Sequence, residues 1–123
     1  MLPLKIKAKV IKGKGRGKGL GIPTINFEIP EDLNISYGVY AGRLLMNKKI
    51  YPAAIHFGHR PVFQEEDKSL EAYILDKFNE NITEGELEFI KFIREIRNFP
   101  NPQEMVNQIK KDVGEIQRIL DNF

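Results

Sequence analysis

Apolar and polar residues alternate near the start of the chain. From residue 4 to residue 10, aliphatic or small side chains take every second position, and lysines take the positions between them. Successive side chains of a β-strand point to opposite faces, so this period of two predicts a half-buried strand with its lysines outward. Similar runs predict strands at residues 24–27, 38–46, 50–57, 70–75 and 87–96, with a loop at residues 58–68. Six strands joined by short connections favour a closed antiparallel barrel, which removes exposed strand edges.

A longer period appears at the C-terminal end. Between residues 105 and 120, apolar residues recur at every third or fourth position, as they do on one face of an amphipathic helix. Asn101 is suited to cap this helix, Pro102 to its first position, and Glu104 to the acidic position of a capping box. The expected fold is therefore mainly β, a six-stranded antiparallel Greek-key barrel with a C-terminal α-helix, as one domain over residues 1–123.

The composition is that of a globular protein and excludes several classes. The 123 residues are 41% hydrophobic and 29% charged, which is enough for one compact core. No apolar run approaches the roughly 20 residues of a membrane helix, and residues 1–9 resemble neither a signal peptide nor a transit peptide. The absence of cysteine excludes disulfides, thiolate metal sites and a cysteine nucleophile. We therefore expect a cytoplasmic protein with no membrane partner. We also expect a monomer.

The net charge of +2 conceals an uneven distribution. Residues 1–27 contain seven basic residues and no acidic one, whereas the rest of the chain contains 12 basic and 17 acidic residues. Such a positive segment suits an anionic partner, either the phosphates of a nucleotide or a nucleic acid. A solvated lysine face on an edge strand, which discourages pairing between sheets, explains the same charges. Charge alone leaves these interpretations open.

Glycine occupies every second position from Gly13 to Gly21. Glycines allow backbone amides to surround a phosphate, and a nearby cation such as Lys18 neutralises its charge. The run is not a Walker loop, because Gly19 stands where that motif requires Ser or Thr, and it does not fit the dinucleotide fingerprint. A flexible turn and a nucleic-acid-binding arm are the alternatives to a phosphate loop.

Polar residues on the predicted strands could carry chemistry. Thr24 and Asn26 are two positions apart, so they share a face and could offer two oxygen ligands to magnesium. Glu71 shares a face with Tyr73 and could take a proton from a hydroxyl group. Each of these side chains could equally be a polar residue exposed on an alternating strand.

Two further groups combine rings and cations. His56 and His59 straddle the end of a predicted strand, but an obvious third ligand is lacking, so zinc is not expected. At the end of the last predicted strand stand Arg94, Arg97 and Phe99. Such side chains bind a phosphate, stack on a heterocycle, or only occupy the end of a strand.

Taken in order, these segments resemble the riboflavin kinase family. Residues 13–26 read GKGRGKGLGIPTIN and are similar to the family signature, a G-x-G-R-G loop followed by L-G-[IF]-P-T-x-N. Residues 38–42 are similar to its G-[VI]-Y-x-G segment, and residues 55–63 to the segment ending in I-G-x-x-P-x-F. Glu71 stands where the family has its catalytic glutamate. The resemblance extends over nearly the whole chain.

The resemblance implies a reaction as well as a fold. The implied reaction is magnesium-dependent transfer of the ATP γ-phosphoryl group to the ribityl 5′-hydroxyl of riboflavin, giving FMN, with Glu71 as the general base. The residues implied for nucleotide binding are Gly13, Gly15, Lys18, Gly21, Thr24 and Asn26, of which Thr24 and Asn26 would also hold magnesium. Those implied for flavin binding are Arg94, Arg97 and Phe99. The implied partners are small molecules, ATP and riboflavin, and no nucleic acid.

The chain departs from the family pattern at three positions. Tyr73 stands where the family often has His, Glu84 where many members have Tyr, and His56 where Asn or Ser is usual. A flavin- or nucleotide-binding module without turnover and a basic nucleic-acid-binding barrel are therefore alternative hypotheses. The retained metal and base residues argue against the first, and the lack of aromatic residues in positions 1–26 argues against the second. Most bacterial relatives carry a preceding adenylyltransferase domain, and without one the chain is not expected to make FAD.

Overall fold

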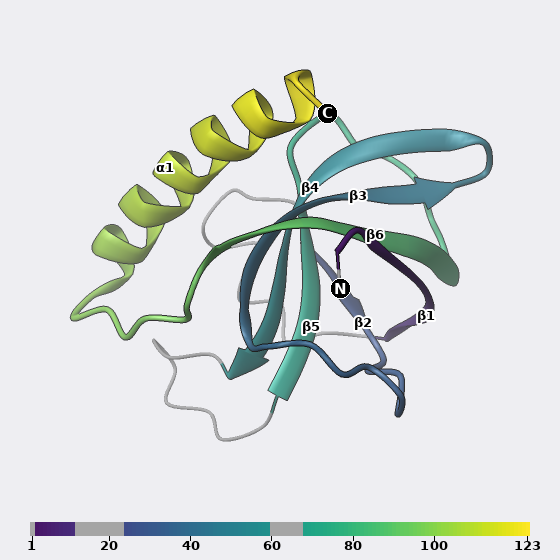
Figure 1. Cartoon of the computed structure of the whole chain (residues 1–123), viewed down its shortest axis with the longest axis horizontal. Coiled ribbons are helices and arrows are strands. Elements are labelled where there is room, and N and C mark those ends of the chain that lie inside the picture. Colours follow the sequence, from purple (N-terminus) through teal and green to yellow (C-terminus); the bar gives the residue numbers. More distant parts are fainter. Residues whose placement is uncertain (1, 12–23, 60–67) are drawn as a thin grey trace.

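The computed structural model describes residues 2–11, 24–59 and 68–123 of the chain. The elements are, in order, β1 (Leu4–Ile11), β2 (Thr24–Phe27), β3 (Gly38–Met46), β4 (Lys49–His59), β5 (Lys68–Ile74), β6 (Glu84–Arg94) and α1 (Pro102–Asp121). Figure 1 shows the strands wrapped around a common centre, with α1 lying along one side. The six predicted strands and the predicted helix are confirmed.

The strands close into an antiparallel barrel in the order β1-β2-β5-β4-β3-β6. β3, β4 and β5 are successive neighbours, and β6 returns to lie beside β3, which is the strand order of a Greek key. The predicted fold class, a six-stranded Greek-key barrel with a C-terminal helix, is thus confirmed. The barrel is completed by pairing between β1 and β6.

Some strand bounds differ from the prediction. β4 extends to His59 and β5 begins at Lys68, although both positions were expected within the loop at residues 58–68. These two residues pair with each other across the strands, so the ladder continues beyond the apolar pattern. β6 begins at Glu84 rather than at residue 87, because Glu84 pairs with Lys9 of β1. Backbone pairing between polar residues does not change the hydrophobic pattern of the sequence. The prediction therefore missed the end of β4 and the starts of β5 and β6.

Apolar side chains from all six strands fill the interior of the barrel. The largest of them, each less than 2% exposed, are Phe27, Phe89, Leu44, Ile55, Leu70 and Leu87. Tyr40 lies edge-on to Phe89 and to Phe92, with 5.3 Å between ring centroids in each pair. Because side chains alternate along a strand, these residues also identify the positions that face outward.

The backbones of β3 and β6 approach closely at Gly42. A Cβ atom there would collide with the Glu88 carbonyl oxygen and with the Ile55 side chain. Gly42→Ala should therefore lower the free energy of unfolding by about 1–3 kcal/mol, measured by urea denaturation. Gly114 is the matched control, because a Cβ atom there meets nothing within 4 Å, and Gly114→Ala in the helix should stabilise by about 1 kcal/mol. A Gly42→Ala variant as stable as the parent would contradict this close approach.

Helix α1 is capped as predicted and packs on the outside of the barrel. The backbone N–H of Glu104 donates to Asn101 Oδ1 at 3.0 Å. Ile116 is fully buried with Ala41 of β3 and Ala54 of β4, whose small side chains allow the helix to come close. In the described part of the chain, no helix combines the length and apolarity that a membrane span requires.

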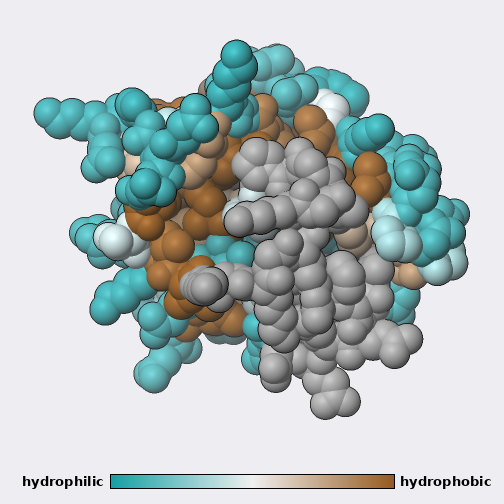
Figure 2. All heavy atoms as spheres, turned by 180° about the vertical axis from the view of Figure 1, so that it is seen from behind, coloured by the Kyte–Doolittle hydropathy of each residue, from teal (hydrophilic) through white to brown (hydrophobic). Residues whose placement is uncertain are grey.

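On the face shown in Figure 2, hydrophilic side chains project along the left and upper right edges. On β1 and β6, the register sets Lys5, Lys7 and Lys9 opposite Glu88, Glu86 and Glu84, respectively. Opposite charges facing each other across neighbouring strands stabilise a sheet by about 0.2–1 kcal/mol per pair. This part of the basic N-terminal segment is therefore a lysine face matched by carboxylates. The other four basic residues of the segment lie outside the described residues.

Candidate active site

A row of polar side chains crosses three neighbouring strands on the outside of the barrel. The register sets Asn26 of β2 opposite Glu71 of β5, and Glu71 opposite His56 of β4. Opposite side chains in antiparallel strands point to the same face. The adjacent residues Leu70 and Phe57 point into the core, so the row faces outward. Its members are distant in sequence and meet only through the strand order.

Thr24 extends this row along β2. It lies two residues before Asn26, on the same face, and opposite Tyr73, which lies two residues after Glu71. The structure thus brings together three predicted site residues, Thr24, Asn26 and Glu71, on one surface of β2 and β5, here called the β2–β5 patch. Tyr73 is half-buried and packs against the apolar cluster beneath α1.

Glu71 is buried although it faces outward, with 2% of its surface exposed. Ser69 Oγ donates a hydrogen bond to Glu71 Oε2 at 2.9 Å. His56 Nδ1 lies 3.8 Å from the same oxygen. A buried carboxylate is costly unless polar groups surround it, so these contacts hold the carboxylate in a polar pocket shielded from water. Sequence reasoning did not identify Ser69 or His56 as partners of Glu71.

The two histidines do not form a pair. His56 faces outward beside Glu71, whereas His59 is exposed, with its ring edge-on to Tyr37 and 5.6 Å between centroids. A separation of three residues places side chains on opposite faces of a strand. Across residues 2–11, 24–59 and 68–123, no three His, Cys, Asp or Glu side chains gather as metal ligands. The structure therefore associates His56 with Glu71 rather than with His59.

Arg94, at the end of β6, is bound to the helix. Its Nε lies 3.0 Å from both carboxylate oxygens of Asp112, and its Nη2 lies 2.8 Å from Oδ2. Asp112 is 3% exposed, so the pair lies between β6 and α1 and is largely shielded from water. Two-pronged arginine–carboxylate pairs are strong and directional. Arg94 thus fixes α1 against the end of β6.

Arg97 and Phe99 lie in the segment between β6 and α1. Arg97 Nη1 donates to Gln108 Oε1 at 3.0 Å, and Gln108 Nε2 donates to Asp112 Oδ1 at 3.0 Å. The guanidinium carbon of Arg94 lies 6.0 Å from the centre of the Phe99 ring. Arg94 and Arg97 thus belong to one hydrogen-bonded network with α1, and Phe99 lies beside Arg94. That these three residues contact flavin stays a prediction.

The β2–β5 patch offers oxygen atoms suited to magnesium. Thr24 provides a hydroxyl oxygen and Asn26 an amide oxygen, on one face of β2. Magnesium prefers oxygen ligands and is usually held by one or two protein groups together with phosphates and waters. The donor set therefore fits magnesium bound with a nucleotide. The other residues predicted to bind nucleotide, Gly13, Gly15, Lys18 and Gly21, lie outside the described residues.

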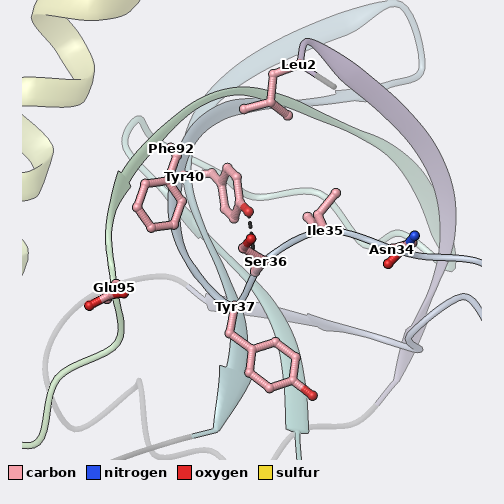
Figure 3. A pocket seen from close by; sticks show the side chains of 8 residues that line it. All are labelled: Leu2, Asn34, Ile35, Ser36, Tyr37, Tyr40, Phe92 and Glu95. Carbon is pink, nitrogen blue, oxygen red and sulfur yellow. Dashed lines mark hydrogen bonds between the residues drawn. The ribbon is translucent and has the colours of Figure 1, made fainter.

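A cavity of about 600 Å³ opens at one end of the barrel (Figure 3). It is lined by Leu2, Asn34, Ile35, Ser36, Tyr37, Tyr40, Phe92 and Glu95. The Tyr40 hydroxyl donates to the Ser36 carbonyl oxygen at 2.6 Å, and burial raises the pKa of this phenol, which keeps the donor protonated. Of the site residues that the structure describes, Thr24, Asn26, Glu71, Arg94, Arg97 and Phe99 are not among those lining this cavity.

Comparison with known proteins points to one family. A family model described as riboflavin kinase matches residues 1–120. The bifunctional riboflavin kinase/FMN adenylyltransferase of Bacillus subtilis is 35% identical over 98% of this chain and 40% of its own length. The riboflavin kinase of Mus musculus is 30% identical over 98% of this chain and 83% of its own length. The chain thus spans about two fifths of the Bacillus relative and most of the mouse one.

Solved structures share the architecture. A crystal structure from Streptococcus pneumoniae, described as a macrolide-efflux protein, superposes with a TM-score of 0.79 at 28% identity, over 94% of this chain and 38% of that one. The riboflavin kinase of Trypanosoma brucei superposes with a TM-score of 0.65 at 22% identity, over 98% of this chain and 82% of that one. The second likeness, at this low identity, supports the barrel and helix alone.

Proposed function

The chain belongs to the riboflavin kinase family, and on this premise we propose that it transfers the γ-phosphoryl group of ATP to the ribityl 5′-hydroxyl of riboflavin, giving FMN and ADP. The observation that carries the proposal is the β2–β5 patch, where Thr24 and Asn26 lie beside the buried Glu71. Phosphoryl transfer depends on alignment of the reactants and on stabilisation of charge, with a positioned group to receive the proton. The patch supplies candidates for the stabilisation of charge and for the group that receives the proton.

Glu71 is the general base in this proposal. Its carboxylate accepts the proton of the 5′-hydroxyl while the hydroxyl oxygen forms a bond to the γ-phosphorus. The bond from that phosphorus to the oxygen bridging the β- and γ-phosphates breaks, and ADP leaves. A positioned base of this kind contributes about 10²–10⁴-fold to the rate. The shielded position of Glu71, with two polar side chains around it, supports this assignment.

Thr24 and Asn26 are the proposed protein ligands of the magnesium that accompanies ATP. Their oxygens lie on the same face of β2 and one strand away from Glu71. When bound, magnesium neutralises charge on the β- and γ-phosphates. The glycine-rich segment and Lys18 complete the nucleotide site in this proposal, on the strength of their similarity to the family signature.

Replacing Thr24 by alanine should weaken binding of magnesium–ATP by about tenfold or more, because a hard-cation ligand is lost. Calorimetric titration with ATP, with and without magnesium, measures the effect. Thr24→Ser keeps the hydroxyl and is the matched control, so its affinity should stay near that of the parent. Equal affinity in the alanine variant would count against Thr24 as a ligand.

The segment after β6 is the proposed flavin side of the site. Arg97 and Phe99 offer a cation and a ring to the flavin, while Arg94 holds the segment through Asp112 of α1. Val39 of β3 pairs with His56 on one side and with Arg94 on the other, so the row that contains His56 continues to Arg94. This alignment supports a flavin whose ribityl chain runs toward Glu71.

The alternative functions receive less support. The three lysines of β1 face glutamates, which weakens the case for a nucleic-acid surface on that strand. A module without turnover has no need to bring Thr24, Asn26 and Glu71 together, as this chain does. The name of the Streptococcus relative refers to macrolide efflux, but the family match over residues 1–120 is to riboflavin kinase, and the proposal follows the family.

The test is an assay for FMN. Purified protein is incubated with riboflavin, ATP and magnesium, and the flavins are separated by chromatography with fluorescence detection. We expect FMN to form only when protein, ATP and magnesium are all present. If FMN fails to form with ATP, CTP, GTP and UTP while riboflavin still binds, the chain is a flavin-binding module and the proposal is wrong.

A further inference from the structure

Two side chains approach the same oxygen of Glu71. Ser69 Oγ donates to Oε2 at 2.9 Å, and His56 Nδ1 lies 3.8 Å from it. Ser69 lies two residues before Glu71 on β5 and therefore on the same face, while His56 lies opposite on β4. Because both come from paired strands of a closed barrel, the backbone fixes their positions relative to the carboxylate.

A carboxylate that acts as a base needs a defined orientation. The terminal torsion of glutamate is broad and nearly two-fold, so either oxygen can face a substrate unless neighbouring groups hold one of them. β4 and β2 flank β5 on opposite sides. Ser69 and His56 both approach Oε2, and neither of these two contacts involves Oε1, the other oxygen of the carboxylate.

We propose that Ser69 and His56 are positioning residues that hold Oε2 of Glu71 and thereby direct Oε1 at the riboflavin hydroxyl. The inference rests on the proposed function. His56 carries a proton on Nδ1 in this arrangement and presents it to the carboxylate. The separation of 3.8 Å exceeds the length of an N–H···O hydrogen bond, which extends to about 3.2 Å. Contacts of this kind are often long before substrate binds and tighten in the reactive complex.

Packing alone does not require a histidine at position 56. His56 is 7% exposed, and a buried polar side chain costs free energy unless its polar atoms are used. An apolar residue such as leucine would fill the site without that cost. The contact with Glu71 gives the buried imidazole a role that an apolar side chain of similar size could not fill.

The experiment measures kcat and KM of FMN formation in two pairs of variants. His56→Leu and Ser69→Ala remove the donors, and kcat should fall about tenfold or more while KM for riboflavin and ATP changes by less than about twofold. His56→Asn places an amide N–H near the former Nδ1, and Ser69→Thr keeps the hydroxyl, so both should keep most of the parent kcat. His59→Leu, on the same strand but exposed, is the matched control and should have parental kinetics.

A double-mutant cycle with Glu71→Gln separates positioning from packing. If His56 acts through Glu71, His56→Leu should lower kcat little further once Glu71 is glutamine. An equal loss of kcat in the glutamine background overturns the inference, as does an equal loss in His56→Leu and His56→Asn. Parental kcat in both His56→Leu and Ser69→Ala overturns it too.

The outcomes also distinguish this inference from the proposed function. If the parent protein forms no FMN, the proposed function fails and the inference fails with it. If the parent forms FMN and Glu71→Gln does not, but His56→Leu and Ser69→Ala match the parent, only the inference is wrong.

Discussion

Replacing Glu71 by glutamine should lower the turnover of FMN formation at least about 100-fold, since a positioned base contributes about 10²–10⁴-fold. The amide has nearly the same size as the carboxylate and can still accept the hydrogen bond from Ser69. It cannot take up the proton of the 5′-hydroxyl. Binding of riboflavin and of magnesium–ATP should therefore be nearly unchanged, so the effect should appear in kcat rather than in KM. Steady-state kinetics together with calorimetric titration of each substrate measure both quantities.

Glu88→Gln is the matched control for this prediction. Glu88 is also a nearly buried carboxylate on a barrel strand, 8% exposed and 3.8 Å from Arg43, but it lies outside the β2–β5 patch. Its replacement should leave kcat unchanged. If Glu71→Gln turned over like the parent, Glu71 would not be the base, and another proton acceptor would have to be sought.

Replacing Asp112 by alanine should lower the free energy of unfolding by about 3–5 kcal/mol, because the largely buried charge of Arg94 loses its carboxylate partner between barrel and helix. The Arg94 side chain is 13% exposed and that of Asp112 is 4% exposed, so water cannot readily replace the lost partner. Gln108 also loses an acceptor for its amide group. For a chain of this length the melting temperature should fall by roughly 10–20 °C. Urea denaturation followed by circular dichroism measures the change.

Two comparisons sharpen this test. Asp121→Ala, near the exposed end of α1, should change stability by less than about 0.5 kcal/mol. The double variant Arg94→Met with Asp112→Leu replaces the ion pair by apolar side chains and should recover most of the loss. If the double variant folds stably and still binds riboflavin as the parent does, Arg94 acts through α1 and not as a flavin contact. A single Asp112→Ala variant of parental stability would contradict the structural role of the pair.

Much of the fold could be predicted because the alternation of apolar and polar residues along a strand indicates which side chains are buried. That rule located β1, whereas along the predicted strand at residues 87–96 the alternation holds only in part. There the register shifts between Val39 and Tyr40, and again between Ala41 and Gly42, so that Val39 faces Arg94 while Tyr40 faces Phe92. An irregular ladder breaks the period of two in the sequence. Hydrophobic pattern therefore recognises regular strands better than bulged ones.

The candidate site was predictable only in part. Thr24 and Asn26 are neighbours on one strand, so their spacing already indicates a shared face. The contact between Glu71 and His56 depends on the register between β4 and β5, which no local pattern encodes. The sequence does indicate that Asp112 is unusual, because it is an acidic residue on the helix face that contains the buried Ile109 and Ile116. A charge at that spacing indicates a buried partner, although not which one.

During synthesis of this chain, β1 is made long before β6, one of the two strands with which it pairs. Leu4 pairs with Phe89 and Lys9 with Glu84, so β1 leaves the ribosome long before β6 exists. β3 also lacks one of its two neighbours during that interval. Barrels built on such distant pairings fold in about milliseconds to seconds, during which unpaired strands can join those of other chains. Lysines on an unpaired edge oppose such joining, so we expect the lysines of β1 to discourage it until β6 is available to pair with them.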